Sequence, residues 1–110
     1  MQQLSAYRIM WLICMFDLPV MEEEERRKAT RFRNDLLDEG FEMAQFSVYM
    51  RHLPSREKAD ALTKRVIARV PPDGKVSVIT ITDKQFGEIT SYHNLKPQAP
   101  AKKHDQLVLL

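Results

Sequence analysis

Residues 9–19 have the sequence IMWLICMFDLP, which predicts the central strand of the protein. Its residues up to Phe16 are apolar without alternation, a pattern typical of a strand buried on both faces at the centre of a sheet. Pro19 cannot donate a ladder hydrogen bond, so the strand ends just after Asp17. Because the run is far shorter than the roughly 20 residues of a transmembrane helix, we expect no membrane span.

The next segment predicts a helix over residues 22–39. Ala29, Phe32 and Leu36 recur at helical spacing, and Gly40 stands where a C-terminal cap glycine belongs. The glutamates of residues 22–25 would open this helix, where acidic side chains suit the positive end of the helix dipole. We favour this structural role for them over metal binding.

Residues 41–52 alternate between polar and apolar and predict one long strand that bends or bulges near residues 45–47. A second helix is expected to begin after Pro54, with Ser55 as its N-cap, and to end at Pro71 and Pro72. Residues 75–83 give the best strand signal because they are rich in β-branched side chains. A weaker strand is expected over residues 86–92.

The order of these elements predicts an α+β sandwich of the ferredoxin-like βαββαβ type, with both helices on one face of a sheet of about four strands. We divide the chain into a ferredoxin-like domain, residues 1–95, and a linker with a C-terminal strand, residues 96–110. That strand is expected to pair with the sheet edge of a second copy, whereas a frayed tail is the alternative. Its residues are Leu107, Val108, Leu109 and Leu110.

Composition excludes several classes of function. The chain has 110 residues and a net charge of +2, but four of its acids stand together at residues 22–25, so the rest is distinctly basic and favours a polyanionic partner. The single Cys14 excludes a disulfide framework and fits the cytoplasm; within its apolar run it is expected to pack as a small hydrophobe. The spacing of the histidines and the few glycines exclude common zinc motifs and phosphate-binding loops.

Asp17 is the residue that we single out for chemistry, because it ends the buried strand. An acid at such a position is often a turn former or a helix N-cap; the alternative is a ligand of a hard metal ion. One carboxylate cannot define a Mg²⁺ site, which needs octahedral oxygen ligands. A two-fold dimer that brings two copies of Asp17 together could hold an ion that activates water for attack on a phosphodiester. Such ligands favour Mg²⁺ or Mn²⁺ over zinc.

Basic residues lie in rows along both expected helices. Such rows can follow a phosphate backbone and supply affinity without sequence readout. The pattern is equally compatible with a solvated face whose arginines pair with nearby acids. The rows are Arg27 with Arg31 and Arg26 with Arg33 on the first helix, and Lys58, Arg65 and Arg69 on the second.

Short motifs along the chain resemble, in their order and spacing, a known family over nearly the whole length. They are MFDLP at 15–19, ERRKA at 25–29, RFR at 31–33, EGF at 39–41, QFSVY at 45–49, GKV at 74–76, ITIT at 79–82 and KQF at 84–86. The family is the small CRISPR-associated spacer-acquisition family, also called CRISPR-associated endoribonucleases. The chain looks most like the versions of type II systems.

This resemblance implies a ferredoxin-like homodimer that exchanges C-terminal strands, binds a captured duplex DNA fragment and bridges two dimers of the CRISPR integrase subunit. It also implies a Mg²⁺-dependent endonuclease that acts on single-stranded RNA or double-stranded DNA, with Asp17 as the catalytic metal ligand. Phe16, where many relatives carry Tyr, and Ser47 match neighbouring family positions. Arg31 and Arg33 are carried over as contacts to the DNA backbone, together with Arg27 as a nucleic-acid-binding residue.

Two hypotheses follow, and they can coexist: a non-catalytic DNA-binding scaffold of spacer acquisition and a metal-dependent nuclease. The alternative is a toxin-like or regulatory ferredoxin-fold nuclease or RNA-binding module outside CRISPR adaptation.

Overall fold

The computed structural model describes residues 8–99, so the expected tail strand, Leu107 to Leu110, lies outside the described residues. The main elements are β1 (Met10–Asp17), α1 (Glu23–Asp38), β2 (Glu42–Gln45), β3 (Val48–Leu53), α2 (Arg56–Ile67) and β4 (Lys75–Thr82). They are followed by α3 (Asp83–Gly87), β5 (Tyr92–His93) and β6 (Lys96–Pro97). Among residues 8–99, no helix has the length and apolar character that a membrane crossing requires.

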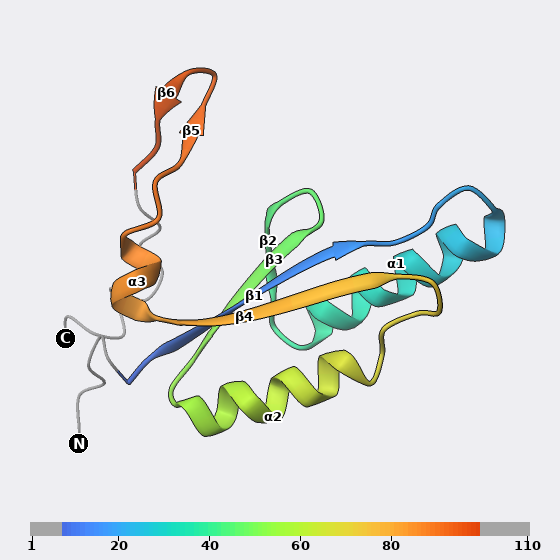
Figure 1. The fold of residues 1–110 in the computed structure, drawn as a ribbon, viewed down its shortest axis with the longest axis horizontal. Coiled ribbons are helices and arrows are strands. Elements are labelled where there is room, and N and C mark those ends of the chain that lie inside the picture. The colour runs from blue at the N-terminus through green and yellow to red at the C-terminus, as the bar shows by residue number, and fades with distance from the viewer. Residues whose placement is uncertain (1–7, 100–110) are drawn as a thin grey trace.

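The four-stranded antiparallel sheet has the order β2-β3-β1-β4, so β1 is a central strand as predicted. Both α1 and α2 cover the same side of this sheet (Figure 1). The order β1-α1-β2-β3-α2-β4 agrees with the expected ferredoxin-like fold. The short β5–β6 hairpin projects beyond α3, away from the sheet (Figure 1).

Residues of β1 alternate between two apolar clusters, because successive strand side chains point to opposite faces. Even-numbered residues of β1, from Met10 to Phe16, pack against Phe32 and Leu36 of α1 and Leu62 of α2 in the main core. Odd-numbered Ile9 and Trp11 instead pack with Phe86 of α3 on the opposite face. The helices therefore cover one face of the sheet, and α3 covers only one end of the other.

Two of the expected strands are corrected by the structure. Residues 41–52 form a hairpin rather than one strand: β2 and β3 are separated by a turn at Phe46 and Ser47, and the register shifts between Met43 and Gln45. Residues 83–87 form α3, whose N-cap Thr82 accepts a hydrogen bond from Gln85 N, so most of the weak strand expected at 86–92 does not exist. The start of the expected linker forms β6.

The predicted bounds of the first helix and the predicted start of the second are confirmed, but α2 ends at Ile67, before the expected stop at Pro71 and Pro72. The side chain of Ser55 accepts a hydrogen bond of 3.2 Å from Lys58 N at the start of α2. At the start of α1 the Glu25 carboxylate accepts a hydrogen bond of 2.9 Å from Glu22 N, which gives the glutamates a capping role. Gly40 follows α1 with φ of +90°, in the left-handed region that glycine adopts readily.

Candidate functional site

The site is built around Asp17, the last residue of the central strand. Asp17 lies opposite Lys75 of β4 in the register. By strand alternation it shares with Ile13 and Met15 the face opposite α1 and α2, which is called the helix-free face here because α3 covers only its far end. The helix after it is capped by Glu22, so Asp17 is not an N-cap. Among residues 8–99 the exposed carboxylate of Asp17 has no hydrogen bond or ion pair with another group, which leaves its oxygens available to a ligand.

The turn between β2 and β3 lies beside Asp17. Phe16 N donates a hydrogen bond of 3.0 Å to the Ser47 carbonyl oxygen, which fastens the turn to the end of β1. Ser47 has φ of 63°, a conformation that L-residues adopt uncommonly. Ser47 therefore supports the site through its backbone, whereas its side chain is exposed.

Phe16 lies on the other side of the strand from Asp17. Its ring packs edge-on against Phe32 at a centroid distance of 5.4 Å and lies 5.5 Å from the ring of Tyr49. These contacts place Phe16 in the core beneath the helices, where it fixes the end of β1. Its position favours a role in holding the backbone of Asp17 over a direct role in chemistry.

The three candidate arginines of α1 have different surroundings. Arg27 forms ion pairs with Glu23 and Glu24 on its own helix. The Arg33 guanidinium donates a hydrogen bond of 3.0 Å to the Thr30 hydroxyl oxygen. Arg31 has no hydrogen bond or ion pair to another group within residues 8–99. Since residues two apart on a helix do not share a face, Arg31 and Arg33 are not brought together.

Arg31 lines an open groove of about 210 Å³ between α1 and the end of α2, together with Lys28, Asp35 and Arg69. Pro71 and Pro72 form part of its apolar wall with Phe32. Lys28 is also without an ion pair to another described residue. The groove therefore offers two uncompensated cations to a phosphate group, with one acid beside them.

The basic row expected on α2 is compensated. Glu39, just after α1, accepts hydrogen bonds of 3.0 and 3.2 Å from Nε and Nη2 of Arg65, and Arg69 lies 3.5 Å from the same carboxylate. The hydrogen bond from Arg65 and the positive charges nearby hold the pKa of Glu39 below its usual value. Of this row, Lys58 alone keeps a side chain without an ion pair among the described residues.

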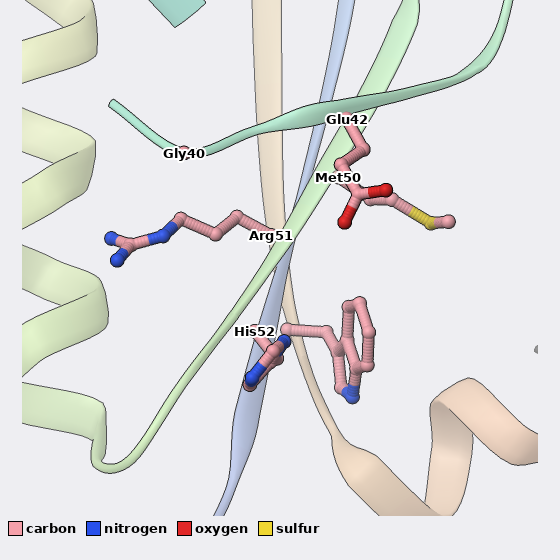
Figure 2. A pocket seen from close by; sticks show the side chains of 6 residues that line it. Gly40, Glu42, Met50, Arg51 and His52 are labelled. Carbon is pink, nitrogen blue, oxygen red and sulfur yellow. The ribbon is translucent and has the colours of Figure 1, made fainter. Parts of the chain in front are cut away.

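A pocket of about 250 Å³ lies at the other end of the sheet (Figure 2). Glu42, Met50 and His52 lie along it, while Arg51 extends to the opposite side of β3 (Figure 2). Trp11 forms part of its lining and stacks on Phe86 with a centroid distance of 3.7 Å. Trp11 is six residues from Asp17, which is about 20 Å along a strand, so this pocket is separate from the candidate metal ligand.

Neither a cysteine nucleophile nor a complete metal site is present in residues 8–99. Burial raises the pKa of the Cys14 thiol to about 11, so the thiol stays protonated at neutral pH, which confirms its packing role. No group of three His, Cys, Asp or Glu side chains that could hold a metal ion occurs among the described residues. Within residues 8–99, one copy thus supplies Asp17 without further clustered ligands.

The helix-free face of the sheet is apolar next to Asp17. Met15 is 40% exposed and Ile79 is 47% exposed, although both lie in the sheet. An open hollow of about 550 Å³ lies over this face, bordered by residues 98 and 99 after β6 and lined by Ile13, Met15, Met43, Met50, Phe86 and Ile89. Contiguous exposed apolar surface of this kind marks an interaction site.

The fold and the site define a small α+β protein with a free carboxylate at the end of its central strand, beside an uncovered apolar face. Residues 10–89 match the model of the family described as CRISPR associated protein Cas2. The chain belongs to this family, as its motifs led us to expect.

Relatives of high similarity are named CRISPR-associated endoribonuclease Cas2. The relative from Paracidovorax avenae is 46% identical over 106 residues, which cover 96% of this chain and 98% of the relative. The relative from Flavobacterium psychrophilum is 45% identical over 107 residues, which cover 97% of this chain and 93% of the relative. The relative from Parvibaculum lavamentivorans is 48% identical, with 91% of this chain and 99% of the relative covered.

Sequence reasoning missed two features of the site. The turn of Phe46 and Ser47 lacks the Asn-Gly or Asp-Gly pair that usually reveals a hairpin, so the sequence predicts an uninterrupted strand through the aromatic residue at its tip. The pairing of Glu39 with Arg65 joins residues 26 apart in the chain, and no local pattern reveals it.

Proposed function

We propose that the chain is a metal-dependent endoribonuclease that works as a homodimer in CRISPR adaptation, with Asp17 as its metal ligand. The observation that carries this proposal is the exposed Asp17 carboxylate without a partner among the described residues, in a chain whose family relatives are named endoribonucleases. Asp17 would act from both copies, since the described part of one copy supplies too few ligands for Mg²⁺.

The dimer is proposed to form through the helix-free face of the sheet. Burying the exposed side chains of Met15 and Ile79 there removes apolar surface from water, at roughly 25 cal/mol per Å². Asp17 follows Met15 on this face, so a two-fold axis near the end of β1 would bring the two carboxylates together. Exchange of the strand Leu107 to Leu110 between copies would strengthen the same contact.

The donor set fits Mg²⁺ or Mn²⁺. Carboxylate oxygen is the ligand that these hard ions prefer, and an exposed strand end leaves room for the water ligands that Mg²⁺ retains. A bound ion would supply a Lewis acid and a water of lowered pKa for phosphodiester hydrolysis. The chain itself contributes the fixed position of Asp17, which the hydrogen bond from Phe16 N to Ser47 and the packing of Phe16 hold in place.

The same dimer is proposed to bind duplex DNA and to join two dimers of the CRISPR integrase subunit. Support comes from Lys28 and Arg31, which face the groove without ion pairs among residues 8–99. Arg33 at the other flank and Arg27 would add phosphate contacts. Backbone contacts of this kind give affinity without sequence specificity.

Cleavage of single-stranded RNA by Asp17→Asn, compared with the unchanged protein, tests the nuclease. We expect Mg²⁺ or Mn²⁺ to support cleavage by the unchanged protein, EDTA to stop it, and Asp17→Asn to reduce it to the EDTA background. Asp60→Asn is the matched control, since Asp60 is an exposed acid of α2, remote in sequence from the site. Cleavage that survives both EDTA and Asp17→Asn would overturn the assignment.

A further inference from the structure

Phe46 is the most exposed aromatic residue of the described chain. Its side chain is 90% exposed at the tip of the β2–β3 turn, whereas all other described aromatic residues except Tyr92, which is 65% exposed, are less than half exposed or buried. Within residues 8–99 it makes no contact with another aromatic ring. An exposed phenyl ring of this kind is a surface that a ligand could cover.

A backbone hydrogen bond fastens the turn that carries Phe46 to the end of β1, beside Asp17. The register of β1 and β3 pairs Met15 with Val48, and the hydrogen bond from Phe16 N to the Ser47 oxygen extends that pairing by one residue. The next residues are Asp17 at the end of β1 and Phe46 in the turn before β3. The ring therefore belongs to the strand end that bears the candidate metal ligand.

Phe46 lies outside the apolar hollow that we assign to the dimer. Its neighbours Gln45 and Val48 line the hollow, but Phe46 and Ser47 do not. Met15 and Met43, which are 40% and 54% exposed, do line it. These observations favour a ligand at the strand end over a second copy of the chain as the group that covers the ring.

We propose that Phe46 stacks on an unpaired nucleobase and so holds a single-stranded nucleic acid against the Asp17 end of the sheet. This inference rests on the proposed nuclease function and deepens it, because it names the residue that selects a single strand. Bases of a duplex are already stacked on one another, whereas an unpaired base has a free face for an aromatic ring. The flat ring supplies this contact without sequence readout.

The test is binding of a short single-stranded RNA that carries 2-aminopurine, whose fluorescence reports stacking, in EDTA so that no cleavage occurs. Phe46→Leu keeps an apolar side chain but removes the ring. We expect it to weaken RNA affinity by about 5- to 150-fold and to remove the stacking signal, since each base stacked on an aromatic ring contributes on this scale. Phe46→Trp should restore both affinity and signal.

Further experiments distinguish single-stranded RNA from single-stranded and duplex DNA as the ligand. They also test whether a second copy of the chain covers Phe46 instead. Single-stranded DNA of the same sequence should show the same loss as RNA, while duplex DNA affinity should be unchanged. Tyr92→Leu, the matched exposed aromatic on the separate β5–β6 hairpin, should leave RNA affinity unchanged. The inference would be overturned if Phe46→Leu bound RNA as tightly as the unchanged protein. It would also be overturned if Phe46→Ala sedimented as a monomer, because the ring would then hold two copies of the chain together.

The failure of this inference can be told apart from failure of the nuclease. If Asp17→Asn abolishes cleavage while Phe46→Leu binds RNA normally, only the stacking role is wrong. If no metal supports cleavage but Phe46→Leu still loses the stacking signal, the stacking role stands and the nuclease assignment is wrong.

Discussion

The indole nitrogen of Trp11 donates a hydrogen bond of 2.7 Å to the carboxylate of Asp83, although the two residues are 72 positions apart. Asp83 is the first residue of α3 and is 5% exposed, and its own backbone N donates to the Ile9 carbonyl oxygen. These two bonds, with the stacking of Trp11 on Phe86, fasten α3 to the face of the sheet opposite α1 and α2.

We expect Asp83→Ala to lower the free energy of unfolding by about 1–3 kcal/mol, because the buried indole N–H loses an acceptor. Urea unfolding followed by Trp11 fluorescence measures the change, since Trp11 is the only tryptophan of the chain. Thr90→Ala, an exposed substitution just after α3, is the control and should change stability little. Variants with Trp11→Phe lack this signal and are followed by far-ultraviolet circular dichroism; the double variant should be less destabilised than the sum of its parts if the pair interacts.

Gly40 terminates α1 by a Schellman arrangement, in which Phe41 N donates to the Leu36 oxygen and Gly40 N to the Leu37 oxygen. We expect Gly40→Ala to destabilise the protein by about 1 kcal/mol, because φ of +90° disfavours a Cβ. The added carbon would also lie 2.8 Å from Arg51 Nε, a flexible contact that can move. Thermal unfolding measures the loss. Gly87→Ala is the control, since nothing lies within 4 Å of its added Cβ, and an equal loss there would contradict the role of the positive φ.

Lys28 and Arg31 are expected to supply more affinity for duplex DNA than Arg27, whose guanidinium is already paired with Glu23 and Glu24. A double variant with Lys28→Ala and Arg31→Ala should weaken binding equally for unrelated sequences and should reduce the salt slope by about 1 per lost phosphate contact. Arg27→Ala should change the slope less. Fluorescence anisotropy over a range of salt concentrations measures both quantities, and an unchanged slope in the double variant would place the DNA elsewhere.

The pairing of Glu39 with Arg65 is expected to make stability fall in acid. Because the pKa of Glu39 is lowered in the folded state, the carboxylate stabilises the fold above its unfolded pKa of about 4.3, and this contribution is lost as pH falls through the folded pKa. We expect Glu39→Gln to be less stable than the unchanged protein at neutral pH, and the difference should shrink below about pH 4. Parallel unfolding curves at several pH values measure it. A difference independent of pH would contradict a charged pair.

Much of this fold could be predicted from local pattern. The unbroken apolar run of β1 predicts a buried strand, and the spacing of Phe32 and Leu36 predicts the helix α1. Ser55 correctly predicts the N-cap of α2. The β2–β3 hairpin was hidden because alternation continues through residues 41–52 and its turn contains Phe46 rather than a glycine. Thr82 and Gln85 form a capping box, which is a sequence signal for the start of α3. The β-branched residues nearby instead favoured a strand in the prediction.

Of the candidate site, only the position of Asp17 at the end of β1 could be predicted from the sequence. Asp17 could be placed from Pro19 and the apolar run alone, and the structure does put it at the end of β1. The charges of the helices could not be assigned in this way. Compensation of Arg65 and Arg69 by Glu39 depends on how two helices pack, whereas the freedom of Arg31 appears only once its neighbours are placed.

The division of β1 into two faces has a genetic consequence. From Leu12 onward, even-numbered positions such as Cys14 and Phe16 point into the core, so substitutions there should lower the amount of folded protein in a cell. Odd-numbered Ile13, Met15 and Asp17 face away from the helices, so substitutions there should leave abundance intact while impairing what the folded chain does. Separation-of-function alleles should therefore cluster at alternate codons of one short stretch of the gene.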